Sequence, residues 1–543
     1  MRIASILAAT LVFLATISAG AVPWQSLVQP HGTRTSIMTG AAANAGFPAA
    51  SPPWDTGTDV TVTKTDRVEQ YVRLYNPTDP SNPSNQAGRW IMRAADVRGK
   101  SVAQLRNDFA LPAVPVYITI VRVPVLAGTG TEIWTGLAGP ITGWGTGGSE
   151  QFYLNGSYIP LSSYINGQLL TAKAMSYEAY AAPGNNARIA AYLDSHIPSA
   201  YSDLENVYDI LDIANYGDRA NLRASLDNIG PAYYDALGET ALNSARLFAE
   251  AARRKGSLGG KTGLWAEAQN GLFRRKDAGE FSGYSERVSG MAAGWTAFTG
   301  EKLSIGMAMG LLRADTNRAD AAGSYGTDTR RIAIYSTYRS GGTALSAQIS
   351  GGLGKTAAKR NIRVYGVDSS GTAYEITRTA SSTPEWKDLM LGLSAEGDWA
   401  MGGIRLNPYA GGWYSAVRTA AFTEQGADSL NLTMSPYTRK TWIAEAGLGA
   451  AMDFNPGKVK LSPYVSAGWE YFAPSGNRPM EAALSAPGTT FTINGLQRQE
   501  AAFAATIGMG ASAGGFGAGL SYKGEFREDA SAGTIRLDTS LSF

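Results

Sequence analysis

Residues 303–311 read LSIGMAMGL, and this stretch decides the fold of the C-terminal half of the chain. Every second side chain, from Leu303 to Leu311, is large and apolar, whereas the side chains between them are small or polar. Because successive side chains of a strand point to opposite faces, this period of two indicates a β-strand with one apolar face. The same alternation returns at residues 459–471 and 535–543. We therefore predict a β-sheet for this half.

The lengths of the connections favour a closed barrel over a sandwich. The sequence contains about twelve candidate strands, which start near Gly263, Tyr284, Lys302, Asp328, Thr343, Trp386, Gly403, Lys440, Lys458, Gln499, Gly515 and Gly533. Short turns, such as 455–457, alternate with longer links at 315–327, 355–385, 419–439 and 473–498. Tight periplasmic turns and long surface loops are typical of an outer-membrane barrel, and an even strand count puts both barrel ends in the periplasm.

Aromatic residues fit that geometry. Those near strand ends are expected in the interfacial girdles of the barrel, and they are Trp295, Trp399, Trp413, Trp469, Tyr471 and Phe543. The chain stops on an alternating strand at Phe543, as outer-membrane barrels do.

Helical patterns precede the barrel. Ser202 and Glu205 form a capping box, and apolar residues at helical spacing follow until Gly217. A second short helix is expected over 218–229. A third begins at Pro231, a favoured first helical residue, and continues to Lys255. At about 1.5 Å per residue it could reach roughly 37 Å, which is long enough to thread a barrel.

The N-terminus predicts export. Arg2 precedes an apolar run, and Ala19 and Ala21 form an A-x-A cleavage pattern, so residues 1–21 are interpreted as a signal peptide. Residues 22–60 are rich in Pro, Gly, Ala and Thr and predict a flexible leader. Residues 61–180, with short apolar runs between Pro and Gly, predict a small β-rich domain without repeats.

Composition excludes several classes of function. A net charge of +2, with 17% charged residues, provides no basic field for nucleic acid. The absence of cysteine excludes disulfides and thiolate metal sites. Neither histidine, His31 or His196, has the partner motif of a catalytic triad. An acidic helical stretch is interpreted as a solvated face and not as a metal site: Asp203, Glu205, Asp209 and Asp212. No metal, cofactor or catalytic residue is expected.

Residues from about 218 to 543 resemble the autotransporter translocator domain of type V secretion. The resemblance is carried by the helical lead-in 226–255, the opening Gly263-Leu264-Trp265, the segment 290–295 (GMAAGW) and the final strand 534–543. It implies an outer-membrane barrel over 256–543, a helical linker over 181–255 whose last helix lies in the barrel lumen, and a passenger on the cell surface. It also implies outer-membrane lipid, the barrel-assembly machinery and periplasmic chaperones as partners, with Phe543 as an assembly signal.

The passenger allows two interpretations. Residues 143–151 (GWGTGGSEQ), together with 88–90 and 111–112, resemble the core of NAD-glycohydrolase toxin domains. That resemblance implies Arg89 at the pyrophosphate and Gln151 at the nicotinamide ribose.

This sequence departs from the toxin pattern, because Tyr117 and Tyr153 offer no histidine and Glu150 replaces a small residue. We therefore expect a non-catalytic surface or adhesion module, and a chain that is not an enzyme. The NAD glycohydrolase is kept as the alternative.

Overall fold

The computed structural model describes residues 22–156, 159–256, 262–299, 302–319, 322–474, 478–496 and 500–543. The predicted signal peptide, with Ala19 and Ala21, lies outside the described residues. The chain divides into two compact units: one extends to Ser176 and includes Val367–Thr372, and the other contains the remaining residues. No helix in the described part of the chain is long and apolar enough to span a membrane.

The N-terminal unit is rich in β-structure, as predicted. Its five-stranded sheet has the order β1 (Gly32–Thr39), β2 (Asp59–Thr65), β6 (Glu132–Leu137), β7 (Glu150–Leu154) and β4 (Trp90–Ile91). A three-stranded sheet contains β3 (Glu69–Tyr75), β5 (Tyr117–Val123) and β8 (Tyr164–Leu169). The helices are η1 (Trp24–Ser26), α1 (Gly40–Asn44), α2 (Ala94–Val97), α3 (Val102–Asp108) and η2 (Leu161–Ser163).

The prediction of a flexible leader over 22–60 is wrong. Residues 32–39 form β1, which pairs with β2 along its length, and Thr39 caps α1 by accepting from the amide of Ala42. Strand β1 lies at the sheet edge with its side chains mostly exposed. It therefore lacks the apolar alternation by which a strand is recognised, and the backbone ladder to β2 holds it in place.

The helices of the second unit are α4 (Asn185–Asp194), α5 (Asp203–Tyr216), α6 (Arg219–Ile229), η3 (Pro231–Tyr234) and α7 (Asp235–Gly256). Three of them, α5, α6 and α7, form close to where the sequence predicts them, whereas α4 had no predicted range. The hydroxyl of Ser202 accepts a hydrogen bond from the Glu205 amide at the start of α5. Because Pro231 opens a 3-10 turn, the long helix α7 begins four residues later than predicted.

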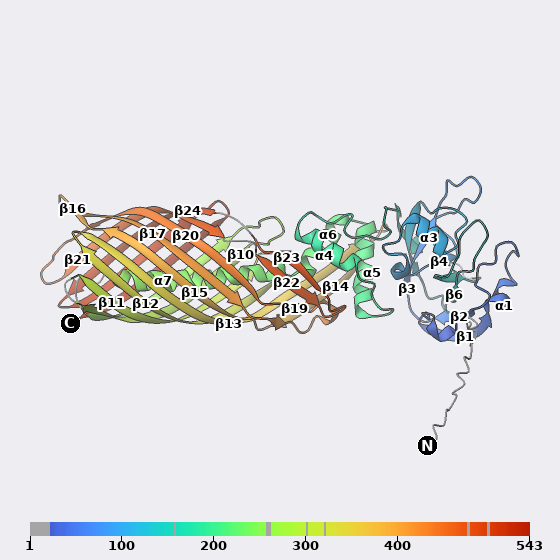
Figure 1. Cartoon of the computed structure of the whole chain (residues 1–543), viewed down its shortest axis with the longest axis horizontal. Coiled ribbons are helices and arrows are strands. Elements are labelled where there is room, and N and C mark those ends of the chain that lie inside the picture. Colours follow the sequence, from blue (N-terminus) through green and yellow to red (C-terminus); the bar gives the residue numbers. More distant parts are fainter. Residues whose placement is uncertain are drawn as a thin grey trace, which may run out of the picture. The chain divides into compact units, whose positions relative to one another are not determined.

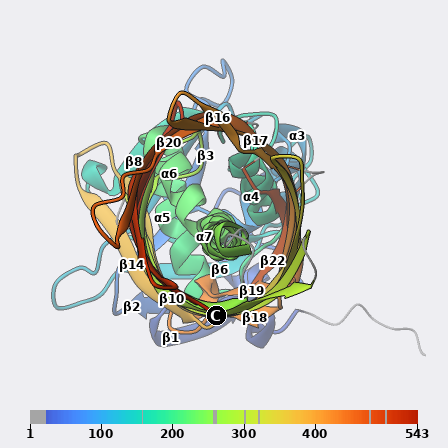
Figure 2. The ribbon, with the colours of Figure 1, turned by 90° about the vertical axis from the view of Figure 1, so that its left-hand side faces the viewer.

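Twelve antiparallel strands close into a barrel within the described residues. They are β9 (Gly263–Arg275), β10 (Tyr284–Thr299), β11 (Leu303–Arg318), β12 (Gly323–Ser340), β13 (Thr343–Val367), β15 (Glu385–Gly397), β17 (Ile404–Thr419), β20 (Tyr437–Met452), β21 (Lys460–Pro474), β24 (Glu500–Ala513), β25 (Phe516–Phe526) and β26 (Ala530–Ser542). The last strand pairs with the first, β26 with β9, which closes the ring. Figure 2 shows α7 inside this ring.

The barrel carries its apolar side chains outward. In β11, Met309 and Leu311 are 68% and 62% exposed, whereas Ser304 and Thr316, which face inward, are 1% exposed. An apolar exterior around a polar interior is the reverse of a soluble sheet protein, and it suits a hydrocarbon environment.

Several links predicted as long loops are strands. The link 315–327 shrinks to four residues between β11 and β12. The link 355–385 is a hairpin, because β13 continues in period two to Val367 and β14 (Ala373–Ser382) returns beside it.

The links 419–439 and 473–498 together build a small separate sheet. Its strands are β18 (Phe422–Thr423), β19 (Leu432–Met434), β22 (Pro479–Leu484) and β23 (Thr490–Asn494), with η4 (Asp428–Leu430) beside them. A short strand, β16 (Trp399–Met401), pairs with β17 in one of the tight turns. In Figure 1 the small sheet and α4–α6 lie at the end of the barrel opposite the C-terminus.

Candidate functional site

The lumen of the barrel, with α7 inside it, is the candidate site. One side of α7 packs Leu247 and Phe248 into a cluster with Trp265 and Tyr335 of the wall. Another side packs Leu242, with Ala245 and Ala249, against wall residues that include Ile443 and Phe472. The small alanines let the helix lie close to the strands, and the helix is therefore in contact with more than one part of the wall.

Charged side chains fix the middle of α7. The guanidinium of Arg246 lies 2.5 Å from a carboxylate oxygen of Glu470 and 2.9 Å from one of Glu525. One turn later, Glu250 accepts from Lys523 at 2.9 Å and from Arg536. All six side chains are largely buried. Such pairs lock orientation, because any single partner left alone would be a buried uncompensated charge.

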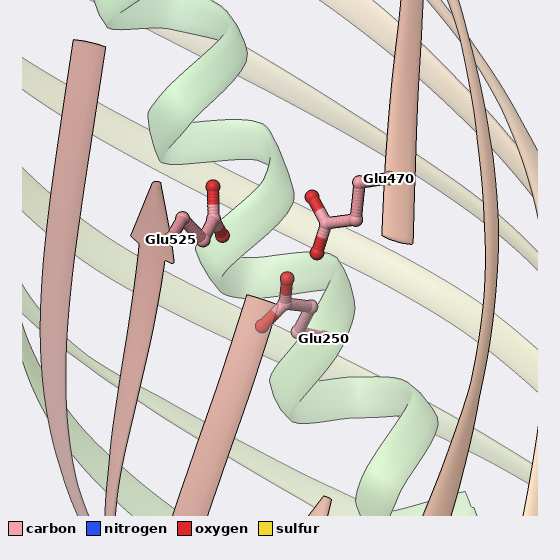
Figure 3. Close-up of side chains that lie close together, drawn as sticks. All are labelled: Glu250, Glu470 and Glu525. Atoms are coloured by element: carbon pink, nitrogen blue, oxygen red, sulfur yellow. The ribbon is translucent and has the colours of Figure 1, made fainter. Parts of the chain in front are cut away.

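The three glutamates come from three different elements. Figure 3 shows Glu250 on the helix and Glu470 and Glu525 on the wall, turned toward one another. Their oxygens lie within 4.8 Å of one another, a spacing that a metal ion could use. Arg246, Lys523 and Arg536 already supply one cation for each carboxylate. The cluster is therefore a salt-bridge network that holds a helix.

Further pairs extend the attachment along the helix. Arg254 lies 2.6 Å from Glu267 of β9, and Arg253 lies 2.5 Å from Glu396 of β15. In the wall, Arg331 of β12 reaches across β13 to Asp388 of β15 at 2.5 Å. The intervening residue is Gly352, where an added Cβ would lie 2.5 Å from the Asp388 carboxylate. Glycine therefore leaves room for this pair.

Helices α4–α6 and the small sheet pack around the start of α7. Glu424, in the link after β18, is paired with Arg360 of β13 at 2.6 Å and accepts from Tyr234 at 2.6 Å. On the outer side, the Arg378 guanidinium beside Asp203 lowers the pKa of that carboxyl to about 2.

The interpretation of the acidic stretch of α5 as a solvated face is therefore only partly right. Asp203 is ion-paired with Arg378, and Asp212 is buried, where it accepts from the Tyr177 hydroxyl at 2.7 Å.

A family comparison identifies this barrel. Residues 264–523 match the model of the autotransporter beta-domain. The C-terminal barrel is an autotransporter β-domain. It is accordingly an outer-membrane domain. No curated protein matches the chain.

Solved autotransporter domains are similar to this β-domain. The translocator domain of NalP from Neisseria meningitidis is 18% identical, with a TM-score of 0.46 over 58% of this chain and 100% of that one. The beta domain of the Bordetella autotransporter BrkA is 16% identical, with a TM-score of 0.36 over 52% and 100%. The transport unit of AIDA-I from Escherichia coli is 11% identical, with a TM-score of 0.32 over 53% and 92%.

Exposure of the aromatic residues predicted for the girdle contradicts one of them. Trp295, Trp399 and Trp469 are exposed on the barrel, by 41%, 57% and 63%. Trp413 is buried at 6% and donates from its indole nitrogen to Glu445 at 3.2 Å. Its neighbours in sequence, Gly412 and Tyr414, gave no indication of which face was inward.

The two residues that the NAD-glycohydrolase interpretation names, Arg89 and Gln151, do not line the same cavity. Arg89 donates to the Tyr153 hydroxyl at 3.1 Å on the surface of the N-terminal unit. Gln151 is 5% exposed and lines a cavity that Arg89 does not line. Sequence reasoning missed Arg73, which lines the same cavity and is 8% exposed. An arginine within an apolar strand was the available indication.

The histidines have partners that the sequence did not reveal. His31 Nδ1 lies 3.0 Å from an oxygen of Glu69. His196 Nε2 lies 2.6 Å from the hydroxyl of Thr489, and its Nδ1 lies 2.7 Å from the carbonyl of Tyr192. The two histidines are thus in different units of the chain.

Proposed function

We propose that the β-domain mediates translocation of the N-terminal unit and displays it on the cell surface as a short passenger. The observation that carries the proposal is α7 inside the closed barrel. Its C-terminal end leads into β9, and its N-terminal end meets α4–α6 at the opposite end of the barrel (Figure 1). A chain that enters through the lumen therefore emerges on the side away from the tight turns.

Assembly of the barrel would use the partners implied by the family. Phe543 is 71% exposed, and its amide donates to the carbonyl of Thr262 at 2.9 Å. A terminal aromatic that stays accessible is available for recognition by the barrel-assembly machinery. Periplasmic chaperones would protect the apolar strand faces before insertion, and folding of the passenger outside the cell would favour outward movement.

The passenger is proposed to bind a ligand without turnover. The cavity that contains Gln151 has no histidine, aspartate or glutamate among its described lining residues. General acid–base work usually needs such a group within hydrogen-bond reach. Gln151 itself is engaged, because its amide nitrogen donates to the carbonyl of Pro53 at 2.6 Å.

Surface proteolysis tests the display. Intact cells that produce the full chain are treated with protease and probed with an antibody against residues 61–170. Loss of the epitope, with the barrel still intact, is the expected result. Protection of the epitope until the outer membrane is opened would contradict display on the surface.

Nicotinamide release tests the absence of turnover. The purified full chain is incubated with NAD, beside Gln151→Ala and Arg89→Ala variants. We expect no release above the rate in buffer for any of the three. Release by the wild type that both substitutions abolish would replace the binding role with NAD hydrolysis.

A further inference from the structure

The N-terminal unit contains a cavity of about 290 Å³. Its volume lies at the lower end of the range found for small-molecule sites. Apolar and aromatic side chains form most of the lining, among them Tyr75, Trp90, Phe109 and Trp144. Arg73 is the one charged side chain among the described lining residues. The cavity is therefore an aromatic chamber with a single positive charge.

Arg73 is buried without a counter-ion. Its Nε and Nη1 donate to the carbonyls of Asn85 and Trp90, each at 3.0 Å. Within the part of the chain that the structure describes, Nη2 donates to no residue and no carboxylate forms an ion pair with this guanidinium. Burial lowers the pKa of Arg73, but arginine stays charged in proteins. A buried charge without a partner is costly.

The position of the guanidinium is tightly fixed. Gly88 presses against it, because a Cβ built on this glycine would lie 2.2 Å from Cζ of Arg73. The carbonyl of Trp90, two residues later, takes one of the hydrogen bonds. Arg73 is therefore held in the cavity wall by Gly88 and by the carbonyls of Asn85 and Trp90, and it cannot swing out to solvent without disturbing the segment that leads into β4.

Gln151 is a second buried polar side chain with an unused hydrogen-bonding atom. It is 5% exposed, and its Nε2 donates to Pro53. Its Oε1 accepts no hydrogen bond from any described residue. The pairing of Trp90 with Tyr153 sets β4 beside β7, so that the cavity receives Gln151 from one strand and Trp90 from the next.

We propose that this cavity binds a small planar organic anion whose carboxylate pairs with Arg73 and whose ring lies among the aromatic side chains. A charged hydrogen bond satisfies Nη2 and compensates the buried cation, and the flat apolar walls favour a ring. A hydroxyl or amine on the same ligand would find an acceptor in Gln151. The inference rests on the proposed binding role of the passenger and names the ligand class for it.

Equilibrium dialysis of the full chain in lipid nanodiscs tests the inference, with empty nanodiscs as the blank. The probes are 2-naphthoate and its neutral analogue 2-naphthamide, which share the ring and differ in charge. Wild type is expected to bind the anion at least about tenfold more tightly, as a charge-assisted hydrogen bond in a buried site implies. Equal binding of the two probes, or binding of neither, would overturn the proposal.

Variants locate the effect in the cavity. Arg73→Met removes the cation, and Gly88→Ala pushes against the guanidinium; both are expected to abolish the preference for the anion. Trp144→Ala is expected to weaken both probes equally, because it removes only wall area. If Arg73→Met fails to fold, Gly88→Ala and the wild-type comparison still decide. An unchanged preference in a folded Arg73→Met variant would contradict the assignment.

The two proposals can fail separately. Surface proteolysis reports where the passenger lies, and its result does not depend on whether the cavity binds naphthoate. Dialysis reports the occupancy of the cavity wherever the passenger lies. A protected epitope with selective naphthoate binding would remove the display proposal and leave the anion site.

Discussion

The barrel lumen and the cavity of the N-terminal unit both bury an arginine, and they treat it in opposite ways. Arg246 faces the carboxylates of Glu470 and Glu525 in the lumen. Among the described residues, Arg73 donates hydrogen bonds to backbone carbonyls alone. The charges around Arg246 thus compensate one another without any ligand, as expected of ion pairs that hold a helix in place. The cavity is incomplete, and a buried group left incomplete is where a ligand contributes most.

Breaking the lumen lock should have the largest effect. Arg246→Met leaves two buried glutamates short of a cation, and loss of one partner of a buried pair costs about 3 to 5 kcal/mol. The loss of stability is measured as the midpoint of urea unfolding of the full chain in detergent. The protease sensitivity of α7 is measured as well. Arg363→Met is the control, because it removes an exposed pair with Glu375 in the β13–β14 hairpin, and exposed ion pairs contribute little to stability. Equal midpoints for the two variants would contradict the lock.

Reversing the polarity of the outer face should have the next largest effect. Met309→Arg puts a charge near the middle of β11, on a side chain that is 68% exposed. On a lipid-facing position this costs about 2 to 4 kcal/mol. Met309→Leu keeps the face apolar and serves as the control. The yield of heat-resistant, membrane-inserted barrel is the measurement, and an undiminished yield for the arginine variant would mean that this face does not meet lipid.

The pH dependence of the N-terminal unit should be smaller. Burial raises the pKa of Glu150 to about 7, although its carboxylate accepts from the amide of Val28 at 2.6 Å. The folded unit therefore holds a proton that the unfolded chain, with a pKa near 4.5, has lost. Stability is greatest below about pH 4.5 and falls as pH rises to about 7, by at most about 3 kcal/mol.

Glu150→Gln should flatten that slope. Calorimetry of the full chain at several pH values follows the transition of the N-terminal unit, and the transition of the barrel provides the internal reference. A wild-type slope that survives in the glutamine variant would assign the proton to another group.

The barrel could be predicted in detail because lipid leaves a chain few choices. Every strand must alternate, and starts such as Gly263, Tyr284 and Thr343 coincide with the observed ones. Outside the hydrocarbon region that constraint ends. Strand β14 and the strands of the small sheet around β19 and β22 are short, and contacts with distant segments stabilise them. The sequence alone therefore predicts loops for these segments.

The candidate sites could be predicted only in part. The lumen helix follows from its period and capping, but its partners do not, because Arg246 meets residues 224 and 279 positions away. Arg73 is hidden for another reason, because its carbonyl partners, 12 and 17 positions away, lie in a segment without regular alternation. Trp413 was assigned to the wrong face because its neighbours are glycine and tyrosine, neither of which marks a side of the sheet.

The occupied lumen also bears on the permeability barrier of the cell. A ring of this circumference without its helix would conduct ions and admit small antibiotics. Because α7 is attached by ion pairs from Arg246 to Arg254, we expect each copy to conduct far less than the empty ring. A cell could therefore carry many copies without adding a matching number of open pores to its outer membrane.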